Sequence, residues 1–469
     1  MRQFVKANSY IGELKLNQPP AIVRHRFAFL ILLFGCSFPS KNEKKAATQT
    51  SVLSPAFVTH LAIYLLENES ITDATLSDQA RQSLKSFPMT AAPSADSLSI
   101  LKDGFYLTRI QKGDEGFMKP DIESWPSSFF QLTEKELQAF SLSDRNLDLV
   151  FFGTSNDVVE KQKQIADFIY ALTKEKKVVI ADLVSIEFYS PTTWKTRRVD
   201  AFQDQTIDIT GHVTIHIYRE GEFCRAVTLG MSNFCLPEIS IRNFPCSDQI
   251  SYGNLINAVT QTLVENPFIN ADSTLHVELK KIKNKKMRDL LLSDIKTDAQ
   301  LATSVKLKWA SPEEGDNPFV QLLIAFENPK YSSPQEEAHQ LVADLFGMQE
   351  SYTVAQHDDE LLAASENAKK RLPELRALFN KGLDPGYSIM VKAPFETPDG
   401  GHEWMWVEVT RWKGEQMEGV LQNDPYEIPD LKVGAIVIFS ELEVFDYMLN
   451  KPDGTSEGNE TGKILEGRE

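Results

Sequence analysis

The spacing of apolar residues along the chain predicts short strands and helices in a mixed order. Apolar runs over residues 59–66, 104–110 and 147–152 predict strands. A helical period over residues 158–172, followed by the apolar run 178–181, completes a strand–helix–strand unit after the third of these strands. Because strands and helices do not alternate strictly, the pattern favours an α+β fold made of several small mixed domains.

The middle of the chain continues this mixed pattern. Two predicted strands are joined by a hairpin turn at residues 219–222, which contain Gly221. The remaining elements here are a helix, three strands and a second helix, at residues 252–264, 275–279, 302–309, 320–326 and 334–346. This order again predicts α+β structure.

The last quarter of the chain predicts helix followed by a strongly bent antiparallel sheet. Helical spacing covers residues 358–368 and resumes at Pro373, which suits a first helical turn, and Gly382 then provides a left-handed end. A capping box from Ser440 to Glu443 predicts a final short helix reaching Met448. The predicted strands lie at residues 387–392, 402–412, 416–421 and 435–439.

Polar and turn-rich stretches divide the chain into six expected segments. They are a signal peptide, a flexible tether, an α+β region, an α+β domain with the β-α-β unit and the hairpin, a second α+β region and a C-terminal domain, at residues 1–35, 36–55, 56–145, 146–270, 271–355 and 356–469.

The N-terminus has the pattern of an export signal. Arg24 and Arg26 precede a wholly apolar run at residues 27–34, and Gly35-Cys36 follows. The run is shorter than the roughly 20 residues that a membrane-spanning helix needs. This stretch resembles the lipobox of bacterial lipoproteins, and the resemblance implies that Cys36 is lipidated and that membrane contact is through a lipid anchor only. A folded N-terminal strand or helix is the alternative.

Charge and cysteine content narrow the function classes. The net charge of −17 argues against nucleic acid as a partner, because phosphate binding needs clustered Lys and Arg. Three further cysteines, Cys224, Cys235 and Cys246, are too few for a disulfide scaffold. In an exported protein one pair would bond and leave one thiol free, with the pairing left open.

The C-terminal region carries a series of ordered motifs, which include Pro398 to Val407, Gly419 to Tyr426, Lys432 to Gly434, Phe445 to Met448 and the Gly-rich stretch from Asp453 to Lys463. On these motifs the region resembles the YegJ-like family of uncharacterised bacterial proteins, domain of unknown function 2314. The resemblance covers about a quarter of the chain and implies no activity.

Polar residues at turns and strand ends of this region are candidates for a shared ligand site. The possible ligand-binding residues are His402, Glu403, Trp404, Trp406, Asp424, Asp446 and Tyr447, with Glu460 beside them. Turn-stabilising carboxylates are the alternative interpretation. Alternation places Trp404, Trp406 and Trp412 on one strand face, which either packs under the preceding helix or forms an aromatic binding platform.

Catalytic and metal-binding patterns are not found in the sequence. Gly230-Met231-Ser232-Asn233-Phe234 departs from the G-x-S-x-G motif at its last position. His212 and His216 are placed on one face of a predicted strand, yet their spacing is wider than strand ligands normally use, so we expect no metal and no cofactor.

These observations favour a non-enzymatic, envelope-anchored protein that binds an unknown protein or small-molecule partner. A hydrolase with an unfamiliar polar site around His402 and Asp424 is the second hypothesis. The third is a cytoplasmic stress or immunity-like protein, which gains weight where Cys36 is not lipidated.

Overall fold

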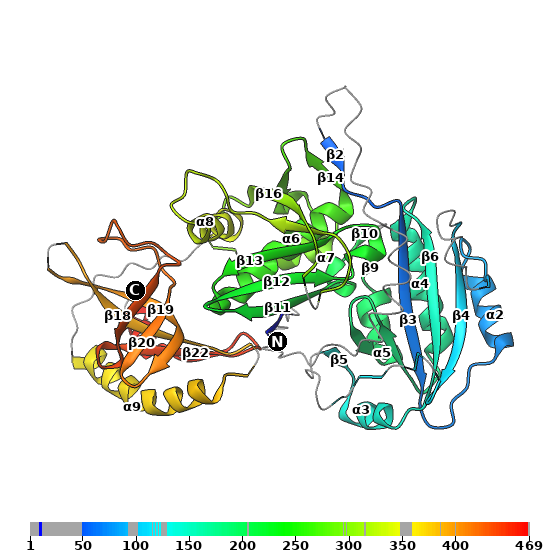
Figure 1. Ribbon diagram of the computed structural model, residues 1–469, viewed down its shortest axis with the longest axis horizontal. Helices are drawn as coiled ribbons and strands as arrows, with labels where there is room; N and C mark the ends of the chain where they lie inside the picture. The colour runs from blue at the N-terminus through cyan, green and yellow to red at the C-terminus, as the bar shows by residue number, and fades with distance from the viewer. Residues whose placement is uncertain are drawn as a thin grey trace.

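The computed structural model describes residues 9–11 and 49–467, apart from 92–101, 115, 118, 121, 123–128, 204–205, 294, 297, 314–315, 348–358, 385 and 399. Three large β-sheets follow one another along the long axis of the molecule (Figure 1). Each is covered by helices, and none of the described sheets closes into a barrel, so the α+β class predicted from the sequence is confirmed.

The first domain is built on a six-stranded sheet in the order β4-β6-β3-β7-β8-β5. Its strands are β3 (Ala56–Leu65), β4 (Gly104–Gln111), β5 (Phe130–Gln131), β6 (Arg145–Thr154), β7 (Val178–Asp182) and β8 (Glu187–Tyr189). One face packs on α2 (Asp73–Ser83), α4 (Val158–Thr173) and α5 (Pro191–Trp194), and the other packs on α3 (Glu134–Ser141). Apolar residues on both faces explain why β3 and β6 read as continuous apolar runs.

The predicted β-α-β unit is β6-α4-β7. Both strands pair antiparallel with β3, so they run parallel to each other with β3 between them. The N-cap of α4 is Asp157, in the left-handed region at φ 53°, and its side chain makes no capping hydrogen bond. Since β6 lies between β4 and β3, the expected boundary between residues 145 and 146 falls inside one sheet.

The central domain has a seven-stranded sheet in the order β1-β11-β12-β13-β17-β16-β15. The strands are β1 (Ser9–Ile11), β11 (Thr214–Glu220), β12 (Phe223–Leu229), β13 (Glu238–Phe244), β15 (Thr274–Glu278), β16 (Ala302–Ala310) and β17 (Gln321–Ile324). Helices α6 (Gln249–Glu265), α7 (Lys285–Leu291) and α8 (Pro334–Phe346) pack on its apolar core. The expected boundary near residue 270 therefore also falls inside a sheet, because the outer strands β15 and β16 follow it in sequence.

Smaller elements connect these two domains. The π-helix η3 (Lys195–Val199) follows α5 directly, and the short pairs β9 (Phe202–Gln203) with β10 (Thr206–Ile207) and β2 (Gln49–Ser51) with β14 (Phe268–Asn270) lie nearby. The pairing of β2 places the end of the expected tether against the central domain. The short 3-10 helices η4 to η7 are Ile209–Gly211, Met231–Phe234, Cys246–Asp248 and Leu279–Lys281.

The C-terminal domain is an antiparallel sheet in the order β21-β20-β19-β18-β22-β23, packed on helix α9 (Figure 1). Its elements are α9 (Asp359–Lys381), β18 (Ser388–Glu396), β19 (His402–Lys413), β20 (Gln416–Leu421), β21 (Ile436–Ser440), η8 (Glu441–Glu443), β22 (Asp446–Asn450), β23 (Ser456–Gly458) and α10 (Glu460–Glu466). Helix, then antiparallel sheet, is the order that the sequence predicts.

Two expectations about the helices of this domain need correction. The two helical segments expected from the sequence are parts of one helix, because Pro373 lies inside α9 and the apolar face around Ala368, Leu372 and Leu375 keeps the helix packed on the sheet. The predicted capping box at Ser440 is present, but it opens only the short helix η8, and strand β22 begins at Asp446 because its backbone pairs with both β18 and β23.

A β-bulge corrects the expected faces of β19. Pairing with β20 shifts register between Val409 and Arg411. The shift turns Trp412 onto the core face beside Phe379 of α9, with ring centroids 6.2 Å apart, while Trp404 and Trp406 stay on the opposite face. Only Trp412 therefore packs under the helix.

Among the helices that the structure describes, none combines the length and the apolar composition that a membrane span requires.

Candidate functional site

The face of the C-terminal sheet that carries Trp406 is turned toward the central domain, and a pocket of about 240 Å³ lies between them. The central domain contributes Pro245, Ser247, Asp248, Tyr252, Gln335 and His339. The C-terminal domain contributes Met390, Trp406, Gln422, Asn423, Val433 and Gly434. The pocket thus exists only where η6, α6 and α8 meet β18, β19 and the loop after β20.

A buried carboxylate holds the two walls together. Glu408 on β19 is fully buried and accepts a hydrogen bond from the Ser247 backbone N–H at 2.8 Å and from the Arg219 guanidinium at 2.9 Å. The hydroxyl of Ser247 also contacts Gln422 Oε1 at 2.8 Å. These contacts fix η6 against β19 beside the pocket.

A disulfide anchors the same short helix to the central sheet. Cys224 on β12 is bonded to Cys246, the first residue of η6, while Cys235 is a buried free thiol. The pairing left open by the sequence is therefore Cys224 with Cys246. Since Ser247 and Asp248 follow directly, the disulfide positions the polar edge of the pocket.

The pocket contains one acidic side chain and one histidine. Burial raises the pKa of Asp248 to about 6, helped by the negative charge of Glu408 and opposed by a hydrogen bond from Ser251. Burial lowers the pKa of His339, with Asp424 acting in the opposite direction. At neutral pH the site therefore presents an ionised Asp248 and a neutral His339, and no lysine or arginine is among its lining residues in the described chain.

The aromatic wall of the pocket is the indole of Trp406. The ammonium of Lys392, its cross-strand neighbour, lies 5.9 Å from the ring centroid. Burial lowers the pKa of this lysine, with Asp446 acting in the opposite direction. Trp404 lies one alternate position away on the same strand face and packs against Phe445, with ring centroids 4.7 Å apart. Of the two tryptophans, only Trp406 lines the pocket.

The carboxylates singled out in the sequence hold turns in place. Glu403 accepts hydrogen bonds from the backbone N–H groups of Tyr426 at 2.8 Å and Glu427 at 3.0 Å. Asp424 accepts one from Val433 N–H at 3.2 Å. Together they shape the loop between β20 and β21, whose residues Asn423 and Val433 reach the pocket.

Asp446 and Tyr447 lie elsewhere in the domain. Asp446 is buried and accepts hydrogen bonds from the Thr461 backbone N–H at 2.8 Å and hydroxyl at 2.6 Å, which ties α10 to β22. The Tyr447 hydroxyl donates to Glu457 at 3.0 Å. The exposed His402 pairs with Glu396 at the far end of β18. The candidate residues are thus spread over the sheet, and Trp406 alone among them lines the pocket.

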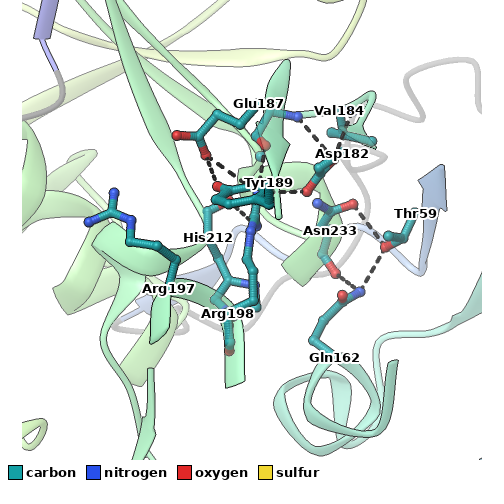
Figure 2. A network of polar contacts seen from close by, with 12 residues as sticks. Thr59, Gln162, Asp182, Val184, Glu187, Tyr189, Arg197, Arg198, His212 and Asn233 are labelled. Carbon is teal, nitrogen blue, oxygen red and sulfur yellow. Dashed lines mark hydrogen bonds and ion pairs between the residues drawn. The ribbon is translucent and has the colours of Figure 1, made fainter. Parts of the chain in front are cut away.

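A second polar cluster joins the first domain to the central domain (Figure 2). Arg198 of η3 is buried and pairs with Asp182 at 2.9 Å and with Glu187 at 3.4 Å. Its guanidinium also donates to Ser185 Oγ at 2.7 Å and to the carbonyl oxygen of His212 at 3.0 Å. The space beside the cluster is only about 10 Å³, less than a ligand needs.

Figure 2 also shows Asn233 and Gln162, whose amide side chains belong to the same cluster. Asn233, from η5 of the central domain, accepts a hydrogen bond from the Thr59 hydroxyl at 2.8 Å, and its carbonyl oxygen accepts one from Gln162 at 2.7 Å. These bonds link β3 and α4 to the central domain. We therefore interpret the whole cluster as a structural contact that holds the first domain against the central domain.

The two histidines proposed for one strand face do not share a strand. His212 follows η4, and β11 begins only at Thr214. The His212 ring nitrogen lies 2.9 Å from Arg198 O, whereas His216 stacks on Phe129 with ring centroids 5.1 Å apart. No group of three or more metal-ligating side chains occurs in the described part of the chain.

Sequence reasoning missed most of the pocket. Asp248, Tyr252 and His339 carry no local motif, because their role depends on contact with the C-terminal domain, which lies later in the sequence. Asn423 lies in the motif from Gly419 to Tyr426, which indicated a family resemblance and not a pocket. The one available clue was that Ser247 and Asp248 directly follow Cys246, because a disulfide at this cysteine would fix the position of both residues.

The comparisons with known proteins concern the C-terminal domain. Residues 358–466 match the model of a family described as an uncharacterized protein conserved in bacteria (DUF2314). This match agrees with the resemblance noted in the sequence and covers all the strands of the C-terminal sheet. No match to the chain was found among curated proteins or among solved structures.

Proposed function

We propose that this protein is an exported, lipid-anchored binding protein of the bacterial cell envelope, without enzymatic activity of its own, and that it holds a small ligand between its central and C-terminal domains. The pocket is the observation that carries the proposal. It brings a carboxylate, an imidazole, an indole and amide groups together in a volume of about 240 Å³. Ligand sites commonly form where two domains meet and combine apolar walls with a few polar groups.

The disulfide supports the exported location. Disulfides persist in oxidising compartments and are rare in the cytosol. The Cys224–Cys246 bond agrees with export directed by the apolar run at residues 27–34. That run and Cys36 lie outside the described residues, so the lipid anchor rests on the sequence. Cleavage before Cys36 would also remove β1, which pairs with β11 at one edge of the central sheet, and β11 would then become the edge strand.

Metabolic labelling with a palmitate analogue tests the anchor. The native chain should incorporate the label and partition with membranes, and Cys36→Ser should abolish both. Cys235→Ser is the control, because this buried thiol should not affect labelling. An intact, unmodified amino terminus in mass spectrometry would overturn the anchor and favour the cytoplasmic hypothesis.

Thermal unfolding in the presence of a metabolite library tests the binding role. A ligand that binds the folded state raises the unfolding temperature. The increase should disappear in Trp406→Ala and persist in Trp404→Ala, because only Trp406 lines the pocket. A library without any stabilising compound, or hits that stabilise both variants equally, would count against the pocket as the functional site.

The hydrolase hypothesis has a separate test. His402→Ala and Asp424→Ala should leave any turnover of generic ester, peptide and phosphate substrates unchanged, since His402 is exposed and Asp424 holds a backbone N–H. Turnover by the native protein that both variants lose would replace the binding role with an enzymatic one.

A further inference from the structure

The charged groups in and around the pocket do not cancel, and one negative charge is in excess. Asp248 is the acidic lining residue, and its described contact is a hydrogen bond from Ser251, not an ion pair. Two other charged groups beside the pocket face opposite charges. Glu408 pairs with Arg219, and the negative charge of Asp446 opposes the lowering of the Lys392 pKa by burial. The pocket therefore carries one negative charge, that of Asp248, which has no ion-pair partner among the described residues.

The remaining walls suit a positively charged, partly apolar guest. The indole face of Trp406 attracts cations through its quadrupole, as the nearby Lys392 ammonium already illustrates at 5.9 Å. Tyr252 lies across the pocket, and the amides of Gln422 and Asn423 add hydrogen-bonding groups. An anionic guest would meet Asp248 and find no lining lysine or arginine among the described residues.

The size of the pocket limits the guest to a small molecule. About 240 Å³ lies below the range of roughly 300–1,000 Å³ that is typical for drug-sized ligands. A compact amine with a few carbon atoms fits this limit, whereas a nucleotide or a peptide does not.

We propose that the pocket binds a small organic cation, such as a quaternary ammonium or a short alkyl amine, with its charge at Asp248 and its apolar part on Trp406. This inference rests on the proposed binding function and specifies its ligand class. An ion pair with a partly buried carboxylate and contact with an indole face are the interactions through which proteins select such cations.

Calorimetric titration of the purified full chain in mild detergent tests the inference with two matched probes. Choline is the cationic probe, and 3,3-dimethylbutan-1-ol is its neutral analogue of nearly the same shape. We expect choline to bind at least about tenfold more tightly than the alcohol, a factor that corresponds to about 1.4 kcal/mol. Putrescine serves as the short amine probe.

Two variants separate charge from shape. Asp248→Asn should weaken choline binding about tenfold and leave the alcohol unchanged, while Trp406→Leu should weaken both. Asp430→Asn is the control for loss of a carboxylate, because it removes an exposed carboxylate of the C-terminal domain that does not line the pocket. Unchanged circular dichroism and unfolding temperature show that each variant is folded.

The outcomes distinguish this inference from the binding role itself. The proposal of a cationic ligand is overturned if choline and the alcohol bind with equal affinity, or if Asp248→Asn does not weaken choline binding. A second outcome is that choline and putrescine do not bind, while a neutral or anionic library compound binds in a way that depends on Trp406. This result also overturns the proposal of a cationic ligand, but it keeps the proposed binding function. If no library compound binds, both the cationic ligand and the proposed binding function are overturned.

Discussion

The Arg219 guanidinium of the central sheet donates a hydrogen bond of 2.9 Å to Glu408 of the C-terminal sheet. Arg219 is partly exposed at its side chain, whereas Glu408 is fully buried. The charge of Glu408 is thus compensated by a residue of another domain, and the attachment of the C-terminal domain depends on this pair.

Arg219→Ala should therefore destabilise the protein. It leaves a buried carboxylate with only the Ser247 N–H, and breaking a buried pair by removing one partner costs about 3 kcal/mol. Chemical denaturation measures this loss, and limited proteolysis should release the C-terminal domain earlier. Arg411→Ala is the control, because the exposed Arg411 pairs with Glu418 at 3.2 Å and lies 3.8 Å from Glu222, and pairs made by such exposed cations contribute less than about 1 kcal/mol. Equal losses in both variants would refute the special role of Glu408.

Removing the disulfide should loosen the pocket as well as the fold. We expect Cys224→Ser with Cys246→Ser to lower the free energy of unfolding by about 3 kcal/mol, given a sequence separation of 22 residues. The same change should weaken ligand binding, because η6 carries Ser247 and Asp248. Reduction of the native protein with dithiothreitol should reproduce both effects, and a reductant-insensitive unfolding curve would contradict the bond.

The remaining thiol should be inert in the folded protein. Burial raises the pKa of Cys235 to about 12, so almost no thiolate is present at neutral pH. In a Cys36→Ser background, Ellman's reagent should detect no thiol in the native state and one after denaturation. A thiol that reacts rapidly in the native state would show that Cys235 is accessible or paired differently.

The acid sensitivity of the protein should depend on His216. Burial lowers the pKa of this histidine from 6.5 to about 4, with Asp316 acting weakly in the opposite direction. In this pH interval the unfolded chain binds a proton that the folded chain does not, so His216 makes the protein less stable as the pH falls from about 6.5 to about 4. His216→Phe should reduce the loss of unfolding free energy between about pH 7 and pH 5.

The choice of phenylalanine keeps the ring that stacks on Phe129 at 5.1 Å. The exposed His276 provides the control, and the pH dependence of His216→Phe is compared with that of His276→Gln. A His216→Phe variant with the native slope would show that other groups cause the acid sensitivity.

Much of the fold could be predicted because its signals are local. The helix from Pro334 to Phe346 and the hairpin around Gly221 follow from apolar spacing and turn chemistry, and both occur where expected. The bulge after Val409 could not be predicted, because it depends on pairing with β20 and not on alternation within β19. That bulge alone separates Trp412 from the other two tryptophans.

The candidate site was less predictable than the fold. Trp406 was singled out from the sequence, but its neighbours in the pocket come from a domain that the sequence does not connect to it. The expected boundaries at residues 145 and 270 failed to mark gaps between sheets for a related reason. Strand β3, which precedes residue 145, pairs with β6, which begins at residue 145, and with β7, which follows it. Strand pairing at long sequence separation leaves little trace in local composition.

The buried charge of Arg198 should be essential for the junction of the first two domains (Figure 2). In Arg198→Met, Asp182 and Glu187 lose their cation in an environment where both side chains are about 2% exposed, so we expect a loss of about 4 kcal/mol in unfolding free energy. Arg197→Met, one residue earlier in the same π-helix, should cost far less, because Arg197 is only partly buried and its side chain donates a longer bond of 3.3 Å to Thr210 O. Neutralising the acids by Asp182→Asn and Glu187→Gln in the Arg198→Met background should restore part of the stability. If the triple variant is no more stable than Arg198→Met, unpaired negative charge is not the cause of the loss.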